Sequence, residues 1–228
     1  MKTVLVTGGS SGLGASVVAA TAKEGWRPYI LDRQAPGAPV DGATWIECDL
    51  ADTRAAEDAT RRVAAEAGRL DAVVTAAGVD VPGRLADVPT EVWERTVAVD
   101  LLATAAVVRA ALPALEQAHG AVVTVASTLG FKAVSDATAY CAAKFGVVGF
   151  TRALAAELAG TVGVTLLVPG GMRTPFFDGR DEQYKPGADA QLNDPASVAA
   201  AVMFALHQPA GSAIREIVVC AERESSYP

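Results

Sequence analysis

The chain has 228 residues, of which 51% are apolar and 20% charged, so we expect a folded protein with a sizeable core rather than a disordered chain. Its formal net charge of −7 argues against non-specific nucleic-acid binding, which needs many Lys and Arg side chains to neutralise phosphates. We expect no apolar run of the sequence to reach the length of a membrane span.

Short apolar runs alternate along the chain with longer stretches of helical periodicity. This alternation predicts a parallel sheet, and the runs of Val, Leu and Ile predict strands buried on both faces. We therefore expect a single domain over residues 1–228, built as a seven-stranded parallel sheet with helices on both faces. In chain order, the predicted elements are strand Thr3–Thr7, helix Leu13–Lys23, strands Pro28–Asp32 and Thr44–Glu47, helix Thr53–Ala67, strand Ala72–Thr75, helix Glu91–Gln117, strand Ala121–Ala126, helix Ala137–Ala159, strand Thr165–Val168, helix Pro195–His207 and strand Glu216–Val219.

The longest stretch without predicted structure covers about residues 172–194. Connections of this length inside a folded domain are uncommon and are often functional or mobile. Because ligands gather at the carboxyl ends of parallel strands, and this stretch follows the sixth predicted strand, we expect it to be a substrate loop.

Three cysteines, Cys48, Cys141 and Cys220, are spread along the chain. An odd and sparse set is not a disulfide framework, and no Cys or His cluster has the spacing of a zinc site. We therefore expect no metal site and a protein of the reducing cytoplasm.

A glycine-rich turn, Thr7-Gly8-Gly9-Ser10-Ser11-Gly12-Leu13-Gly14, joins the first predicted strand to the first helix. Gly8 permits a tight turn, Gly12 lets the backbone approach a pyrophosphate, and Gly14 lets the helix pack against the strand. The helix N-terminus offers amide groups to the phosphates. The turn therefore predicts a dinucleotide site, to which its other members Ser10, Ser11 and Leu13 also belong, the two serines as hydroxyl donors.

Asp32 ends the second predicted strand, 24 residues after Gly8. A carboxylate at this position accepts hydrogen bonds from both ribose hydroxyls of the adenosine half and repels a 2′-phosphate. The neighbouring Arg33 is able to pair with such a phosphate. Since the ribose meets Asp32 first, the sequence favours NAD(H) over NADP(H) as cofactor.

Tyr140 and Lys144 stand four residues apart on a predicted helix and therefore share one face. A tyrosine with an ordinary pKa of about 10 is a poor base, but a nearby positive charge favours its phenolate. Ser127, 13 residues earlier, ends the fifth predicted strand, where its hydroxyl reaches a substrate oxygen. These three residues predict proton transfer to and from an alcohol or ketone.

With these motifs, essentially the whole chain resembles the short-chain dehydrogenase/reductase family, of the single-domain type with a Tyr-x-x-x-Lys pair. The resemblance implies a Rossmann-type, doubly wound α/β fold. It implies that Tyr140 is the catalytic acid/base, that Lys144 binds the nicotinamide ribose and lowers the tyrosine pKa, and that Ser127 orients the substrate.

Further segments resemble the cofactor-binding elements of that family. Cys48-Asp49-Leu50 is similar to its adenine-binding segment, with Asp49 capping the adenine amino group. Thr75-Ala76-Ala77-Gly78 resembles its N-N-A-G element, with both asparagines replaced. In Pro169-Gly170-Gly171-Met172-Arg173-Thr174-Pro175, the Met172 main chain and the Thr174 hydroxyl are implied to hold the carboxamide. The remaining cofactor residue implied in this way is Val99.

Asp100 stands where the family usually has an asparagine that holds a water behind the lysine. Its shape is nearly the same, and its carbonyl is still able to hold that water. Its charge attracts Lys144 and partly cancels the effect of that residue on Tyr140. We therefore expect a working enzyme with an alkaline-shifted pH profile; the alternative is that the replacement is neutral.

The substrate pocket is expected after predicted strands four, five and six. Its candidate lining is apolar and aromatic, which favours a small to medium hydrophobic or mixed substrate. The candidates are Val79, Leu129, Phe131, Phe176, Phe177 and Tyr184. The basic residues Arg173, Arg180 and Lys185 either meet an acidic group or face water.

The sequence thus predicts an NAD(H)-dependent oxidoreductase acting on a secondary alcohol or ketone as its small-molecule partner. Two alternatives remain open. The same site chemistry supports reduction of a 3-oxoacyl thioester, and a catalytically weak NAD-binding sensor or scaffold is compatible with Asp100 and the replaced asparagines. The family resemblance further implies a homotetramer or homodimer.

Overall fold

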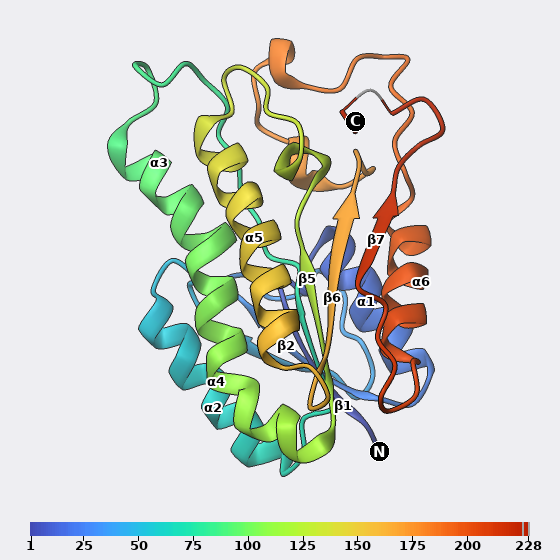
Figure 1. Ribbon diagram of the computed structural model, residues 1–228. Helices are drawn as coiled ribbons and strands as arrows, with labels where there is room; N and C mark the ends of the chain where they lie inside the picture. Colours follow the sequence, from blue (N-terminus) through green and yellow to red (C-terminus); the bar gives the residue numbers. More distant parts are fainter. Residues whose placement is uncertain (225, 228) are drawn as a thin grey trace.

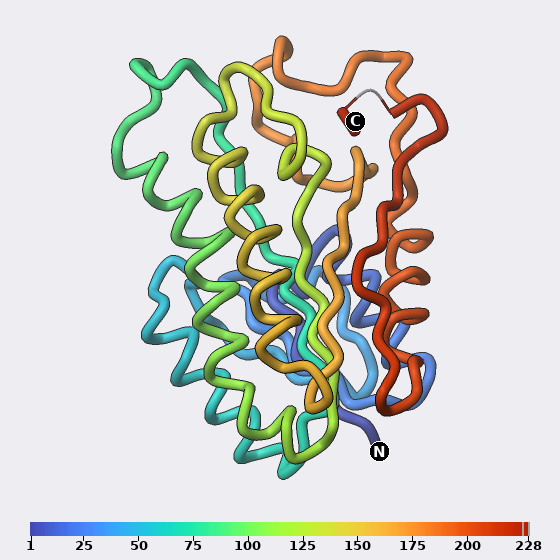
Figure 2. The backbone as a smooth tube through the Cα atoms, in the orientation of Figure 1, coloured from blue at the N-terminus to red at the C-terminus, as the bar shows by residue number. Residues whose placement is uncertain are grey.

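Across the described residues, which are 1–224 and 226–227, the computed structural model contains one seven-stranded, all-parallel sheet (Figures 1 and 2). Its strand order is β3-β2-β1-β4-β5-β6-β7. This confirms the predicted sheet, and the predicted strand bounds differ from the observed ones by two residues at most. The strands are β1 (Thr3–Thr7), β2 (Arg27–Asp32), β3 (Thr44–Glu47), β4 (Ala72–Thr75), β5 (Ala121–Val125), β6 (Gly163–Pro169) and β7 (Glu216–Val219).

Helices cover both faces of the sheet because successive side chains of each strand point to opposite faces. In β1, Leu5 packs into the core beneath α2 (Thr53–Ala67) and α4 (Ala103–Ala118). Its neighbours Val4 and Val6 pack on the other face, beneath α1 (Gly12–Lys23) and α6 (Pro195–Leu206) (Figure 1). On the first face, α5 (Thr138–Glu157) lies beside α4.

The predicted helix at Glu91–Gln117 is interrupted by a wider turn. It consists of α3 (Thr90–Val97), a π-helical turn η1 (Ala98–Leu102) and α4. Single π turns inside α-helices are frequent at functional sites. This one carries Asp100, whose side chain is fully buried.

The helical stretch Thr90–Ala118 is long and apolar enough to cross a membrane by length and composition. The expectation that no apolar run reaches that length is therefore wrong for this stretch. A core helix passes the same test, and 44% of its most apolar window is buried against the rest of the protein.

The predicted substrate loop folds back on itself near its two ends. Met172 and Asn193 form an isolated parallel bridge, and the Arg173 N–H donates to the Asn193 carbonyl (2.9 Å). Between them lie two short 3-10 turns, η3 (Pro175–Phe177) and η4 (Glu182–Tyr184). In Figure 2 this segment lies at the carboxyl end of the sheet, opposite the N-terminus.

The glycine-rich turn brings β1 and α1 into backbone contact. Gly8 has a φ of +68°, and a Cβ on it would lie 2.6 Å from the Cα of Ala77 in the turn after β4. A Cβ on Gly14 would overlap the Gly8 carbonyl oxygen. The predicted packing role of Gly14 therefore matches the observed geometry.

We expect Gly14→Ala to lower the free energy of unfolding by about 1–3 kcal/mol, because the added methyl group meets rigid backbone. The matched control is Gly149→Ala on the exposed side of α5, where a Cβ meets nothing within 4 Å. That control should raise stability by up to about 1 kcal/mol through helix propensity. Urea unfolding measures both, and equal stability of the two variants would contradict the assigned geometry.

Candidate active site

A cavity of about 810 Å³ opens at the carboxyl ends of the strands, where the strand order reverses between β1 and β4. Ligands of open parallel sheets bind at such a position. Most of the predicted cofactor and catalytic residues line it: Gly8, Ser11, Gly12, Leu13, Asp32, Arg33, Asp49, Leu50, Ala76, Ala77, Gly78, Val99, Ser127, Tyr140, Lys144, Pro169, Gly170, Met172 and Thr174. The structure thus brings together residues that lie far apart in the sequence.

The turn before α1 has the properties of a phosphate cradle. Gly12 lines the cavity with a φ of +52°, and a Cβ on it would lie 3.3 Å from the side chain of Thr174. No side chain caps the first turn of α1, and that turn holds no acidic residue. Its amide groups are therefore available for an anion, and the residues present fit the pyrophosphate of a nicotinamide dinucleotide.

Asp32 is held in a fixed orientation at the end of β2. Its two carboxylate oxygens accept hydrogen bonds from the backbone N–H groups of Ser10 and Gln34, both at 3.1 Å. The Ser10 hydroxyl donates to the Gln34 carbonyl (2.6 Å), and Ser10 does not line the cavity. In this structure the Ser10 hydroxyl therefore anchors the segment that carries Asp32 and does not face the cavity, to which it was expected to offer a donor.

Asp49, two residues after the end of β3, lines the cavity, but its carboxylate already has hydrogen-bond partners within the protein. Its carboxylate pairs with Arg95 of α3 at 2.9 and 3.1 Å and accepts a hydrogen bond from the Ala51 N–H (3.0 Å). These contacts hold the pKa of Asp49 below its usual range, first of all through the bond from Arg95. Arg95 also lines the cavity and had no distinguishing signal in the sequence.

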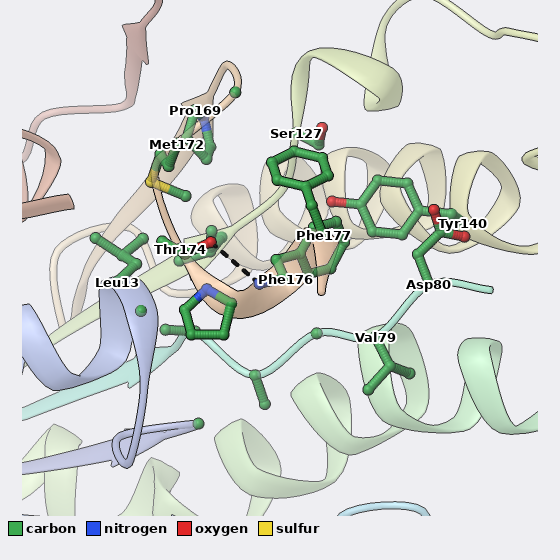
Figure 3. A pocket seen from close by; sticks show the side chains of 18 of the residues that line it. Leu13, Val79, Asp80, Ser127, Tyr140, Pro169, Met172, Thr174, Phe176 and Phe177 are labelled. Atoms are coloured by element: carbon green, nitrogen blue, oxygen red, sulfur yellow. Dashed lines mark hydrogen bonds between the residues drawn. The ribbon is translucent and has the colours of Figure 1, made fainter. Parts of the chain in front are cut away.

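Tyr140, Ser127 and Lys144 meet at one wall of the cavity. Tyr140 comes from the start of α5 and is 9% exposed, and in Figure 3 its hydroxyl points toward the side on which Ser127 lies. Ser127 follows β5 and accepts a hydrogen bond from the Leu129 N–H (3.1 Å). The Lys144 Nζ lies 5.4 Å from the centroid of the Tyr140 ring.

Lys144 forms a buried ion pair with Asp100. Its Nζ lies 3.3 Å from Asp100 Oδ2 and donates to the Val125 carbonyl at 3.1 Å. The other oxygen, Asp100 Oδ1, accepts from the Val79 N–H at 2.8 Å. A Cβ on Gly78 would lie 3.2 Å from the Asp100 carboxylate, so this position favours glycine.

The Lys144–Asp100 ion pair influences the protonation states of both Lys144 and Tyr140. Burial lowers the pKa of Lys144 more than any other single cause, but the charges of Asp100, Tyr140 and Asp80 and the hydrogen bond with Asp100 together outweigh it, so the pKa is raised and the ammonium form persists. Burial raises the pKa of Tyr140; Lys144 acts against this shift, whereas Asp100 adds to it. A side-chain hydrogen bond with Ser127 favours the phenolate.

The substrate side of the cavity differs in part from the prediction. Val79, Leu129, Phe176 and Phe177 line it, and the Phe176 ring lies 5.6 Å from the Tyr140 ring (Figure 3). Two predicted aromatic residues do not line it. Phe131 packs against Tyr227 and Arg152, and the Tyr184 hydroxyl donates to Asp136 (3.4 Å). Both side chains anchor loops beside the cavity.

Sequence reasoning missed two further contributions to the cavity wall. Asp80 pairs with Arg180 at 3.0 Å, so that Arg180, 100 residues away, contacts the loop after β4 instead of facing water. The C-terminal segment also reaches the cavity through Arg223, Glu224 and Ser226. Glu224 accepts from the Gly171 N–H (3.1 Å), a contact for which the sequence contains no periodic signal.

The sequence profile described as short chain dehydrogenase matches residues 2–185. The chain belongs to the short-chain dehydrogenase family. This confirms the resemblance seen in the motifs. It makes the protein an oxidoreductase of a family that acts on alcohols and ketones.

Named relatives of this short-chain dehydrogenase include two enzymes of small alcohols. It is 37% identical over 169 residues to the D-threitol dehydrogenase of Mycolicibacterium smegmatis. The matched residues cover 70% of this chain and 65% of that protein, so this chain spans just under two thirds of the length of that relative. It is 30% identical over 216 residues to the meso-2,3-butanediol dehydrogenase of Serratia marcescens, covering 89% and 86% of the two chains.

A solved structure confirms the Rossmann-type, doubly wound fold. The 3-ketoacyl-(acyl-carrier-protein) reductase of Brucella melitensis, complexed with NADH, matches with a TM-score of 0.86 and 26% identity over 97% of this chain and 98% of that chain. Other matching structures contain an NADP derivative or NADPH. Nicotinamide dinucleotides of both kinds therefore occur among the structural neighbours of this short-chain dehydrogenase.

Proposed function

We propose that this short-chain dehydrogenase interconverts a secondary alcohol and its ketone with NAD(H), and that Tyr140 is the general acid/base. The observation that carries this proposal is the meeting of Tyr140, Ser127 and Lys144 at one cavity wall, next to a cradle that fits a dinucleotide. The cradle and the group of Ser127, Tyr140 and Lys144 are more than a hundred residues apart in sequence. The cradle fits the cofactor, and the group fits the proton transfer.

In the direction of oxidation, the Tyr140 phenolate accepts the proton of the substrate hydroxyl, and in reduction the phenol returns it. A bound nicotinamide ring supplies the partner for hydride transfer at the carbon that bears this oxygen. Ser127 accepts a hydrogen bond from Leu129 through its oxygen, so its single proton is donated either to the Tyr140 oxygen or, when substrate is bound, to the substrate oxygen. These contacts orient the reacting carbon against the cofactor.

Lys144 is proposed to contact both the cofactor and the acid/base Tyr140. An ammonium group has three donors, and Lys144 directs one to the Val125 carbonyl while its charge pairs with Asp100. We propose that a remaining donor binds the nicotinamide ribose. The fixed ammonium then stabilises the Tyr140 phenolate and positions the cofactor.

Asp32 and Arg33 carry the proposed preference for NAD(H). The Asp32 carboxylate lines the cavity and is fixed by two backbone hydrogen bonds, and Arg33 lines the cavity from the next position. The fixed negative charge repels a 2′-phosphate. NADP(H) is therefore the less favoured cofactor.

The two alternative functions are weaker. Reduction of a 3-oxoacyl thioester gains some support from the Brucella melitensis structure, whose complex contains NADH. The net charge of −7 disfavours docking of an acidic carrier protein. A catalytically weak sensor or scaffold is disfavoured because Ser127, Tyr140 and Lys144 are all present and converge.

Assembly and location remain predictions. Leu102 and Phe145, on η1 and α5, are 49% and 45% exposed, which favours burial of this apolar surface in a homodimer or homotetramer. The proposed partner is a small-molecule alcohol or ketone. The three cysteines are free, in keeping with the expected reducing cytoplasm.

The proposal is tested by the appearance of the NADH absorbance band with a panel of secondary alcohols. Tyr140→Phe should lower kcat by roughly two to four orders of magnitude, because it removes the proton-transferring group. Tyr29→Phe, in the core beneath α2, is the matched control and should stay within about twofold of the wild type. NAD binding without turnover of any alcohol, or unchanged activity in Tyr140→Phe, would contradict the proposal.

Removing the charge of Asp32 should change the cofactor preference. Asp32→Asn keeps an oxygen that accepts from the backbone but no longer repels a phosphate, while Arg33 remains. We expect the ratio of kcat/KM for NADP to that for NAD to rise about tenfold or more, equivalent to about 1.4 kcal/mol. Asp41→Asn, an exposed loop carboxylate outside the cavity, is the control. An unchanged ratio would remove Asp32 from the proposed role.

Asp100→Asn should shift the pH dependence of alcohol oxidation. The negative charge of Asp100 raises the pKa of Tyr140, and oxidation needs the phenolate. Its removal therefore lowers that pKa and moves the rising limb of kcat/KM to lower pH, by about one unit for a charge a few ångströms away. Asp87→Asn, in an exposed loop, should leave the limb in place. Superimposable profiles of the wild type and Asp100→Asn would show that the replacement is neutral.

A further inference from the structure

Asp80 is a buried carboxylate in the wall of the proposed substrate pocket. Its side chain is 7% exposed, it lines the cavity together with Tyr140, and Figure 3 shows it beside the Tyr140 ring. The preceding residue, Val79, is fixed through its N–H by Asp100 (2.8 Å), so the backbone at this point has little freedom. None of the proton-transfer steps uses Asp80.

The partner of Asp80 is Arg180 from the substrate loop. The guanidinium is 11% exposed and stacks on the rings of Phe176 and Phe177, with its central carbon 4.6 and 4.9 Å from their centroids. Asp80 Oδ2 accepts one hydrogen bond from it at 3.0 Å. The two charges cancel, so the pair is a neutral polar group beside the apolar rings of Phe176 and Phe177.

The hydrogen-bonding capacity of this pair is incomplete on both sides. Among the described residues, no group donates to the other oxygen of Asp80, and the buried Nε–H of Arg180 has no acceptor. Buried polar atoms of native proteins usually have partners, so the unfilled oxygen of a buried carboxylate at a cavity wall points to a ligand that donates a hydrogen bond. A hydroxyl group donates to such an oxygen and accepts from a guanidinium group, and therefore complements an Asp–Arg pair.

Charge excludes the other simple ligands. A substrate carboxylate would meet the negative charge of Asp80, and an amine would meet the positive charge of Arg180. A hydroxyl adds no charge to a pair that is already neutral. Burial raises the pKa of Asp80 to about 6; Arg180 and Lys144 act against this shift and Asp100 adds to it, so at pH 8 the carboxylate is ionised and only accepts hydrogen bonds.

We propose that the Asp80–Arg180 pair binds a second hydroxyl of the substrate, and that the substrate is a small polyol rather than a simple alcohol. This inference rests on the proposed alcohol dehydrogenase activity and names its substrate class. One hydroxyl reaches Tyr140 and Ser127, and a more distant hydroxyl of the same molecule reaches the pair. A site with such polar groups discriminates strongly against an analogue that lacks the matching hydroxyl, because its own groups then stay unpaired.

The test compares kcat/KM for D-threitol with that for 2-butanol, a four-carbon alcohol with a single hydroxyl, at pH 8 with NAD. The wild type should prefer D-threitol. In the double variant Asp80→Leu/Arg180→Leu, which replaces the ion pair by apolar side chains of similar size, the preference should fall at least tenfold. Asp80→Asn keeps an acceptor for Arg180 and preserves the loop contact if the double variant does not fold; it should lower the preference at least threefold.

Asp87→Asn, on the same loop after β4 but exposed and outside the cavity, is the matched control and should keep the preference within twofold. If Asp80 and Arg180 only anchor the substrate loop, both alcohols lose activity equally and the unchanged preference overturns the inference. A wild type that oxidises 2-butanol but not D-threitol overturns it as well and leaves the proposed function standing. A wild type that oxidises no alcohol of the panel refutes the proposed function itself.

Discussion

The buried ion pair between Lys144 and Asp100 is the contact on which the rest of the active site depends. It joins four segments: the first turns of α5, the π-helical turn η1, the end of β5 through the Val125 carbonyl, and the loop after β4 through the Val79 N–H. Each segment contributes a group to the cavity wall. A shift of either charged side chain would therefore displace both the proposed acid/base and the proposed substrate contacts.

Such a pair is expensive to bury, because both ions lose their hydration. The protein offsets this cost with additional hydrogen bonds, one from Lys144 to a carbonyl and one to Asp100 from a backbone amide. The π turn presents Asp100 to this point from inside a long helix. Breaking one partner of a buried pair is commonly more harmful than replacing both, which makes the pair a structural constraint as well as a chemical one.

The sequence predicted the strands well because buried parallel strands are short, apolar and bounded by turn residues. It also brought out Tyr140, Lys144 and the glycine turn, which line one cavity in the structure, since each motif depends on spacing within one element. The interruption at Asp100 was not predictable, because a π turn leaves the apolar periodicity of a helix nearly unchanged. Periodicity likewise says nothing about how a helix will be surrounded, and 44% of the most apolar window of the stretch 90–118 is buried.

The contacts that sequence reasoning missed are those between segments far apart in the chain. Arg180 resembled an ordinary surface cation until the fold placed it against Asp80, 100 residues earlier. Phe131 and Tyr184 had the residue types expected of a pocket wall, but the directions of their loops turn both side chains away from it. Side-chain direction in an irregular loop is set by tertiary contacts, which no local pattern encodes.

The electrostatics of the cavity support a neutral, hydroxylated substrate over an ionic one. Lys144 pairs with Asp100 at 3.3 Å, and Arg180 pairs with Asp80 at 3.0 Å. Asp100 is fully buried and does not line the cavity, whereas Asp80 and Arg180 both do and present a dipole rather than a net charge to whatever occupies it. A dipole that is fixed by burial orients a hydroxyl group without attracting an ion, which is why the proposed second hydroxyl is assigned to the Asp80–Arg180 pair while Lys144 is left to the nicotinamide ribose.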